Sequence, residues 1–397
     1  MKRKMVVLSV CLLIVAGLNF AQQGYVAVGH TWSYTHGTGD TDFLIYQLDL
    51  TGATQWQKNL GGLDFDFGRS IQQTRDGGYI VAGQTTSYTH GGWDFLIYKL
   101  DASGGKLWRK NFGGEEDDWS SAIQQTTDGG YVVAGLTESF THGVGDRDYL
   151  IYKLDANGGK LWRKNLGGKK DDWPGDIQQT TDGGYVIAGT AYSYTHGTGD
   201  TDILIYKLDG TGAKQWRKHL GGIQFDQGTS IQQTKDGGYV VAGYSTSYTQ
   251  TVGYEDFLVY KLNGMGQKQW RKNFGGAKSD EAWAVQQTTD GGYIVAGMTW
   301  SYVHGPAGDQ DVLIYKLDAT GTQQLQRNLG GTELDRARSI QQTKDGGYIL
   351  CGDSMSFTFG GWDFLIYKLD PNLRKQWRKN LGGDLDDFGY DIQLTGN

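Results

Sequence analysis

Eight aromatic residues stand where an otherwise regular sequence changes, and they are the side chains best suited to binding. The set is Trp32, Phe67, Trp93, Trp119, Trp173, Trp300, Trp362 and Phe388. A flat ring can stack on a sugar while nearby Asp, His and Thr side chains hydrogen-bond its hydroxyls. These residues form our candidate ligand-binding set, and we expect them in the longer loops. The alternative is that the rings only cover the ends of packed sheets.

Five histidines occupy one position in the repeated sequence: His36, His90, His142, His196 and His304. Their loops are expected about two strands away from the centre of the fold predicted below. At ~4.8 Å per strand, neighbouring copies would be roughly 10 Å or more apart, too far to share one metal ion. We therefore expect each histidine to hydrogen-bond within its own loop.

Glycine-rich acidic loops could suggest calcium. The segments 37–42 and 197–202 read GTGDTD, and 143–148 reads GVGDRD. They lack the third acidic position and the distal glutamate of helix-flanked calcium loops. The weak calcium candidates are Asp40, Asp146, Asp200 and Asp309. We assign no metal site, no cofactor and no catalytic residue, because Gly-x-Ser-x-Gly, zinc-type Cys/His spacing and a recognisable carboxylate pair are absent from the sequence.

The elements that carry these residues follow from a repeat. The segment IQQTTDGGYVVAG (123–135) returns along the chain at intervals of 52 to 55 residues. Its tyrosine recurs as Tyr25, Tyr79, Tyr131, Tyr185, Tyr239, Tyr293 and Tyr348. A fixed period of this length is typical of solenoids, propellers and related arrays.

Each period contains four segments that read as strands. In the second period they are residues 70–74, 79–85, 94–100 and 106–112, all rich in Ile, Val, Tyr or Trp. Two connections are short Asp/Gly hairpin turns, and the other two are longer. Four antiparallel strands in each of seven periods predict an all-β fold, a seven-bladed β-propeller.

The two ends of the repeat array complement each other. The first period begins at GYVAVG, a second strand without a first, and the last ends at GYDIQLT (389–395), a first strand without a second. Pairing them in one blade would close the ring and leave no exposed sheet edge there. We therefore predict a single propeller domain over residues 22–397.

Residues present in nearly every blade are assigned to the framework. A tryptophan on the fourth strand is expected to wedge between blades: Trp56, Trp108, Trp162, Trp216, Trp270 and Trp377, with Leu325 in the remaining blade. An aspartate after a Gly-Gly pair is expected to accept backbone N–H groups: Asp66, Asp118, Asp172, Asp226, Asp280, Asp335 and Asp387.

The amino-terminal residues predict export. Residues 1–21 combine a basic start, an apolar run too short to span a bilayer and a small residue at Ala21, as signal peptides do. Their removal leaves 34 basic and 44 acidic residues, a net charge of −10, which disfavours a nucleic-acid partner. Cys351 then has no disulfide partner and should be buried. We expect a periplasmic or extracellular monomer without a transmembrane segment.

The segment YKLDASGGKLWRKNFGG and its copies resemble the tryptophan-docking repeat of pyrroloquinoline-quinone-type propellers, which carries Asp, Gly, Lys and Trp in similar order. The Asp-to-Trp spacing differs by one residue, and the quinone dehydrogenases have eight periods, a calcium site and insertions that have no counterpart here. The full period is more similar to tandem propeller repeats of uncharacterised exported bacterial proteins. That resemblance implies a fold and no activity.

Together these observations favour a binding protein over an enzyme. The expected partner is a glycan or an envelope protein, bound on the face that holds the longer loops. The first alternative is an enzyme with an axial pocket: a hydrolase, a lyase or a quinone-type oxidoreductase. The second is a scaffold for an envelope assembly. The sequence does not choose between glycan and protein.

Overall fold

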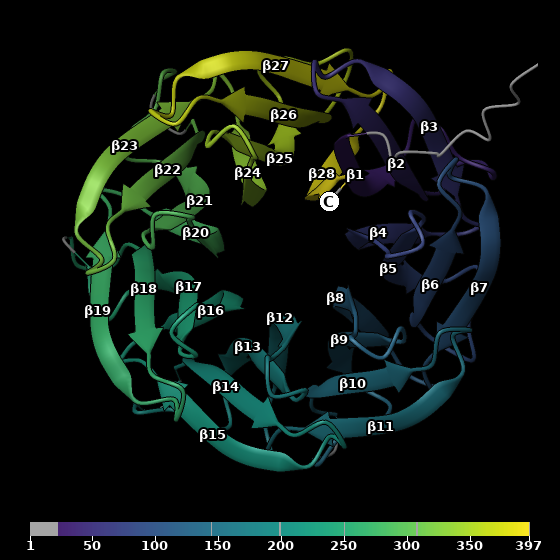
Figure 1. Ribbon diagram of the computed structural model, residues 1–397, viewed down its shortest axis with the longest axis horizontal. Helices are drawn as coiled ribbons and strands as arrows, with labels where there is room; N and C mark the ends of the chain where they lie inside the picture. The colour runs from purple at the N-terminus through teal and green to yellow at the C-terminus, as the bar shows by residue number, and fades with distance from the viewer. Residues whose placement is uncertain (1–22, 144, 198–199, 250, 307–308, 397) are drawn as a thin grey trace, which may run out of the picture.

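The computed structural model describes residues 23–143, 145–197, 200–249, 251–306 and 309–396. The predicted signal peptide, residues 1–21, lies outside these ranges. Seven four-stranded antiparallel sheets stand around a central axis as blades (Figure 1). The predicted all-β, seven-bladed propeller is therefore confirmed. None of the described residues forms a helix long and apolar enough to cross a membrane.

Each blade has an innermost strand next to the axis. These strands are β4 (Asp66–Gln73), β8 (Asp118–Gln125), β12 (Asp172–Gln179), β16 (Asp226–Gln233), β20 (Asp280–Gln287), β24 (Asp335–Gln342) and β28 (Asp387–Thr395). The second strands are β1 (Gly24–Thr31), β5 (Tyr79–Thr85), β9 (Tyr131–Thr137), β13 (Tyr185–Ala191), β17 (Tyr239–Ser245), β21 (Tyr293–Thr299) and β25 (Tyr348–Ser354).

The two outer strands of each blade follow. The third strands are β2 (Asp42–Asp49), β6 (Asp94–Leu100), β10 (Asp148–Leu154), β14 (Asp202–Leu208), β18 (Asp256–Leu262), β22 (Asp311–Leu317) and β26 (Asp363–Leu369). The outermost strands are β3 (Thr54–Leu60), β7 (Lys106–Phe112), β11 (Lys160–Leu166), β15 (Lys214–Leu220), β19 (Lys268–Phe274), β23 (Gln323–Leu329) and β27 (Lys375–Leu381).

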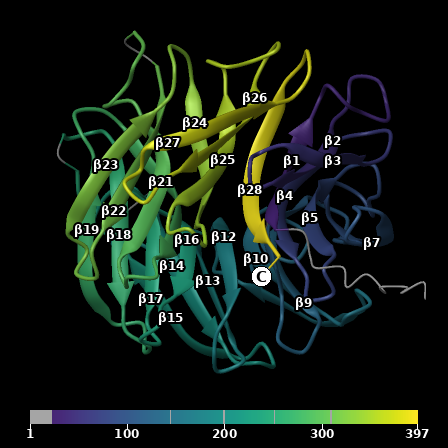
Figure 2. The ribbon, with the colours of Figure 1, turned by 45° about the horizontal axis from the view of Figure 1, so that its top comes forward.

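Ring closure occurs as predicted. The strand β28 pairs with β1 from Gly24–Thr395 to Thr31–Asp387, so the two ends of the chain share one sheet. Figure 2 shows β28 running along the axis to the C-terminus beside β1. This pairing supplies β1 with its inner neighbour, and no blade has to carry an unpaired edge at the seam.

Packing between blades explains why the sequence repeats so closely. The second and third strands are buried almost throughout, because both of their faces are covered by neighbouring blades. Each framework tryptophan contacts the repeat tyrosine of the next blade edge-to-face, with ring centroids 5.5 to 6.0 Å apart. The predicted wedge is confirmed, and Leu325 packs against the core of the blade that lacks a tryptophan.

The framework aspartates hold the connections between blades. In all seven blades the carboxylate accepts the N–H of the second glycine of the preceding Gly-Gly pair at 2.7 to 2.8 Å. This aspartate is also the first residue of the innermost strand. That strand begins at Asp66 in the second period, whereas the sequence pattern predicted a start at Ser70. The other three predicted strands of that period match β5, β6 and β7.

The two ends of the propeller differ in their connections. One end, the long-loop face, carries the loops between second and third strands and the links between blades. The other, the short-turn face, carries hairpin turns such as 74–78 and 101–105, closed by bonds like Gly77 N–H to Thr74 C=O at 2.9 Å. Each innermost strand runs from the long-loop face to the short-turn face, so its first residues lie at the long-loop mouth of the axis.

Candidate axial binding site

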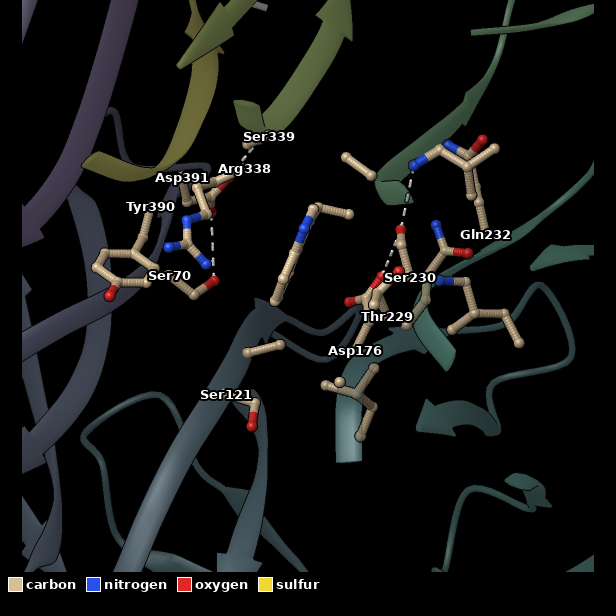
Figure 3. Close-up of a pocket in the computed structure, with 18 of the residues that line it drawn as sticks. Ser70, Ser121, Asp176, Thr229, Ser230, Gln232, Arg338, Ser339, Tyr390 and Asp391 are labelled. Carbon is tan, nitrogen blue, oxygen red and sulfur yellow. Dashed lines mark hydrogen bonds between the residues drawn. The ribbon is translucent and has the colours of Figure 1, made fainter. Parts of the chain in front are cut away.

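A cavity of about 330 Å³ lies on the axis and is lined by all seven innermost strands. Figure 3 shows the labelled lining residues projecting from different strands around one space. Most of the lining falls into three layers, each with one residue per blade, and the rest is aliphatic: Ile123, Ile177, Ile231, Val285 and Ile340. Comparing the seven residues of a layer separates framework from candidate function.

The layer nearest the short-turn face is uniform. It consists of Gln72, Gln124, Gln178, Gln232, Gln286, Gln341 and Gln393. Six of these glutamines accept a backbone N–H from the innermost strand of the next blade. The glutamine ring therefore ties the innermost strands together, and its uniformity marks it as framework.

The middle layer mixes small residues with two carboxylates: Ser70, Ala122, Asp176, Ser230, Ala284, Ser339 and Asp391. Asp391 accepts hydrogen bonds from Ser70 Oγ at 3.3 Å and Ser339 Oγ at 2.9 Å, and Asp176 accepts one from Ser230 Oγ at 3.3 Å. Burial, with a smaller contribution from the Asp391 carboxylate, raises the pKa of Asp176 to about 6. Burial also raises the pKa of Asp391.

The layer nearest the long-loop face has six residue types in seven blades: Arg69, Ser121, Gly175, Thr229, Trp283, Arg338 and Tyr390. Each of these residues is the unpaired residue of a β-bulge in its innermost strand. A bulge inserts one extra residue and redirects a side chain, and bulges are common next to functional sites. We call these seven residues the bulge layer.

Arginine and aromatic side chains of the bulge layer contact one another. The Arg69 guanidinium lies 4.3 Å from the Tyr390 ring centroid, and that of Arg338 lies 5.1 Å away. Arg338 also lies 4.8 Å from the ring of Trp283. Cation–π contacts of this kind hold guanidinium groups against aromatic faces. One wall of the cavity thus presents two cations and two rings.

Charged groups behind this wall set its electrostatics. Arg338 Nε donates to Asp353 Oδ1 at 3.2 Å, and Arg336 approaches the same carboxylate at 3.8 Å while donating to Gln310 Oε1 at 2.9 Å. Burial and the Glu255 carboxylate together raise the pKa of Glu281 to about 7, against the opposing effect of Arg338.

Five of the eight predicted binding residues gather at the mouth of the axis: Trp32, Phe67, Trp93, Trp362 and Phe388. We call these five the rim cluster. The ring centroid of Phe67 lies 5.2 Å from that of Trp93 and 5.9 Å from that of Trp32. The ring centroid of Phe388 lies 5.7 Å from that of Trp362 and 6.0 Å from that of Trp32.

The buried ring of His30 joins the rim cluster to the cavity. Its centroid lies 4.4 Å from that of Phe67, 5.0 Å from that of Phe388 and 5.4 Å from that of Tyr390. Burial lowers the pKa of His30 well below its usual range, and Arg69 and Arg338 lower it further. An apolar surface therefore continues from the long-loop face to the bulge layer.

The other three predicted residues lie apart from the rim cluster. Trp119 and Trp173 sit under the Arg147 guanidinium, at 5.5 and 5.8 Å, and none of the ring contacts found in the described ranges involves Trp300. The predicted loop location is wrong for Phe67, Trp119, Trp173 and Phe388, which belong to innermost strands. The reason is that each strand begins at the framework aspartate, so the next residue is already paired.

The histidine and calcium candidates lie further out. Each of the five histidines bonds through Nδ1 to the aspartate that opens the third strand of its own blade, such as His90 with Asp94 at 2.6 Å. Asp40 and Asp309 accept N–H groups of Gly37 and Gly305 in their own loops at 2.9 and 3.0 Å. Within the described ranges no three His, Cys, Asp or Glu residues are grouped to hold a metal. Asp40, Asp146, Asp200 and Asp309 stay weak calcium candidates, with no metal site assigned.

Sequence reasoning missed the bulge layer, Glu281 and Asp353. The signal was present, because aligning the seven periods on the framework aspartate shows one column that reads Arg, Ser, Gly, Thr, Trp, Arg and Tyr. The strand pattern placed this column at the edge of a strand, where variation looks like loop variation. Cys351, predicted to be a small buried residue, is buried.

Comparison with known proteins supports the fold and leaves activity open. No family model matches the chain, so the resemblance to quinone-type repeats stays a prediction. The regulatory protein FlaEY of Caulobacter vibrioides is 22% identical over 174 residues, which are 38% of this chain and 18% of that protein. The match thus covers less than a fifth of the length of that relative.

Solved propellers are similar over nearly the whole chain. A periplasmic gluconolactonase of Pseudomonas aeruginosa, PpgL, superposes with a TM-score of 0.58 at 11% identity, covering 93% of this chain and 99% of that chain. A protein of unknown function from Bacteroides caccae has a TM-score of 0.47 at 13% identity, covering 93% and 98%. At these identities the likeness concerns the fold alone.

Proposed function

We propose that this protein is an exported propeller that binds a glycan and takes a terminal sugar into the axial cavity from the long-loop face. The observation that carries the proposal is the bulge layer. Seven nearly identical blades differ in chemistry at this layer, where two arginines, a tryptophan and a tyrosine surround one space. Export rests on the sequence of residues 1–21.

The size and lining of the cavity suit a sugar. A volume of about 330 Å³ is at the low end for small-molecule sites, which combine apolar walls with a few placed polar groups. Trp283 and Tyr390 offer rings for stacking, while Ser121, Thr229 and Asp176 offer oxygen atoms to sugar hydroxyls. The rim cluster could then contact the next sugar units outside the cavity.

A glycan array probed with residues 22–397 tests this proposal. We expect a small set of related glycans to bind, and Trp283→Ala to reduce that binding at least tenfold while the variant stays folded by circular dichroism. The control is Met265→Ala, in an exposed hairpin turn of the short-turn face. Full binding by folded Trp283→Ala would contradict an axial site. A blank array, with an envelope protein whose binding requires Trp283, would favour the protein-partner alternative.

A second candidate function is hydrolysis or elimination at the long-loop mouth of the cavity, where Glu281 is the second residue of β20. Glu281 favours it, because a carboxyl group with a pKa of about 7 can donate or accept a proton near neutral pH. Perturbed groups of this kind cluster at functional sites. Lactones are the first substrates to test, given the gluconolactonase with the same fold. Turnover that Glu281→Gln abolishes would establish an enzyme, and binding without turnover would leave the glycan-binding proposal.

A further inference from the structure

Two blades carry the same cross-strand pair with different charge. In the blade with β24 and β25, Arg338 Nε donates to the Asp353 carboxylate. In the blade with β4 and β5, the equivalent Arg69 Nε donates to Gln84 Oε1 at 3.4 Å. Gln84 pairs with Phe67 and Asp353 pairs with Arg336, and each of these partners lies two residues before the bulge-layer arginine of its blade. Gln84 and Asp353 therefore hold the same register position. The glutamine accepts the hydrogen bond without neutralising the cation.

Arg69 is therefore a cation without a counter-charge at the cavity wall. In the part of the chain that the structure describes, no carboxylate lies within 4.0 Å of its guanidinium nitrogens, whereas Arg336 and Arg338 share Asp353. Its guanidinium is held on the ring of Tyr390, against which Arg338 also packs. A buried or half-buried cation is costly unless something pairs with it.

Other residues of the bulge layer, and the carboxylates of the middle layer, have the opposite character. Thr229 Oγ donates to Ala282 C=O at 2.9 Å, and Ser121 Oγ donates to Pro174 C=O at 2.9 Å. With their protons engaged, both hydroxyls present oxygen lone pairs as acceptors. The Asp176 and Asp391 carboxylates lie in the middle layer. A ligand that fits this lining carries an anionic group facing Arg69 and hydroxyl donors facing these acceptors.

We infer that the sugar taken into the axial cavity carries a carboxylate, as uronic acids do, and that Arg69, with Arg338 beside it, binds this carboxylate. This inference rests on the glycan-binding function proposed above and specifies its ligand class. Guanidinium groups match the planar geometry of a carboxylate and can bind it through two parallel N–H bonds. One unpaired cation matches one negative charge, while a phosphate dianion would add a second charge close to Asp353 and Asp391.

The test is titration calorimetry of residues 22–397 with matched acidic and neutral sugars. The probes are glucuronic and galacturonic acid, their neutral parents glucose and galactose, the uronic acid amides, and glucose 6-phosphate. We expect at least one uronic acid to bind ten times or more tightly than its parent and its amide. Arg69→Gln should remove this preference, and Arg69→Lys should keep part of it. Arg374→Gln, an exposed arginine of the short-turn face, is the charge-matched control and should change nothing.

The outcomes separate this inference from the proposed function. Equal binding of acidic and neutral sugars, or a preference that survives Arg69→Gln, would overturn the carboxylate assignment and leave glycan binding intact. Tighter binding of glucose 6-phosphate than of either uronic acid would also overturn it. Failure of every sugar to bind, here and on the array, would count against both proposals. The melting temperature of each variant shows that lost binding is not lost folding.

Discussion

Arg338 and Asp353 form an ion pair between β24 and β25 that occurs in one blade of seven, with Nε and Oδ1 3.2 Å apart. The Asp353 side chain is fully buried and that of Arg338 is 15% exposed. Arg69, hydrogen-bonded to the uncharged Gln84, holds the equivalent place two blades along the ring. The propeller thus holds two arginines at the same register position, Arg338 with a counter-charge and Arg69 without one.

The first prediction concerns this comparison. Asp353→Asn should lower the free energy of unfolding by about 3 kcal/mol, because it leaves two partly buried arginines without a counter-charge. Gln84→Ala should cost about 1 kcal/mol, as the loss of one hydrogen bond does. Urea denaturation measures both. Equal costs for the two substitutions would show that Asp353 acts as a hydrogen-bond acceptor and not as a counter-charge.

The second prediction concerns pH. Because folding raises the pKa of Glu281 from 4.5 to about 7, the folded state holds its proton more tightly than the unfolded state. Its contribution to stability is therefore complete below about pH 4.5 and is lost as pH rises through 7. Asp176, with a pKa of about 6, acts in the same direction. The protein should be more stable at pH 5 than at pH 8.

Glu281→Gln isolates the contribution of this one carboxyl group to the pH dependence of stability. The amide keeps the shape and removes the charge, so the loss of stability between pH 5 and pH 8 should shrink by about 2 kcal/mol. Glu115→Gln, in an exposed loop, is the control and should leave the pH profile unchanged. If both variants follow the wild-type profile, the Glu281 carboxyl is not the group that titrates.

The third prediction concerns the wedge between blades. Trp162 packs edge-to-face on Tyr185 of the next blade, with centroids 5.7 Å apart. Trp162→Ala should cost about 3 kcal/mol, typical of a large-to-small change at a packed aromatic. Trp162→Leu should cost less, since Leu325 fills the same place in another blade. Thermal unfolding measures the stability of both variants, and a Trp162→Leu variant no more stable than Trp162→Ala would contradict this prediction.

The fourth prediction concerns ring closure. Deleting residues 388–397 removes nearly all of β28 and leaves β1 as an open edge, so the melting temperature should fall by about 10 °C or more. A circular permutant that joins the present ends and opens the 101–105 turn keeps every strand and should melt near the wild type. A truncated protein as stable as the full chain would refute closure by β28.

Sequence alone predicted the repeated parts of this molecule well. The strands 79–85, 94–100 and 106–112 agree with the structure because each borders a short Asp/Gly turn at one end and is rich in Ile, Val, Tyr or Trp. The innermost strand was placed four residues late. The bulge at Arg69 breaks the two-residue alternation there, so Asp66 and Phe67 read as loop.

The candidate site was harder to predict because its residues are far apart in the sequence. Arg69, Trp283 and Arg338 meet only because the blades form a ring and each innermost strand bulges at the same point. The rim aromatics could be predicted as a class, but which of them gather around His30 depends on blade order. Glu281 looked like an ordinary strand residue because its raised pKa arises from burial and from Glu255, on the preceding blade.

The central claim is that the ligand binds on the axis, within the bulge layer. The most direct test is a crystal structure of residues 22–397 with the sugar that binds best in the array and the titrations. The account predicts density for that sugar between Arg69, Trp283 and Tyr390, with further units extending toward the rim cluster. Density on the short-turn face or over Trp119 and Trp173, with no sugar between the bulge-layer residues, would contradict it.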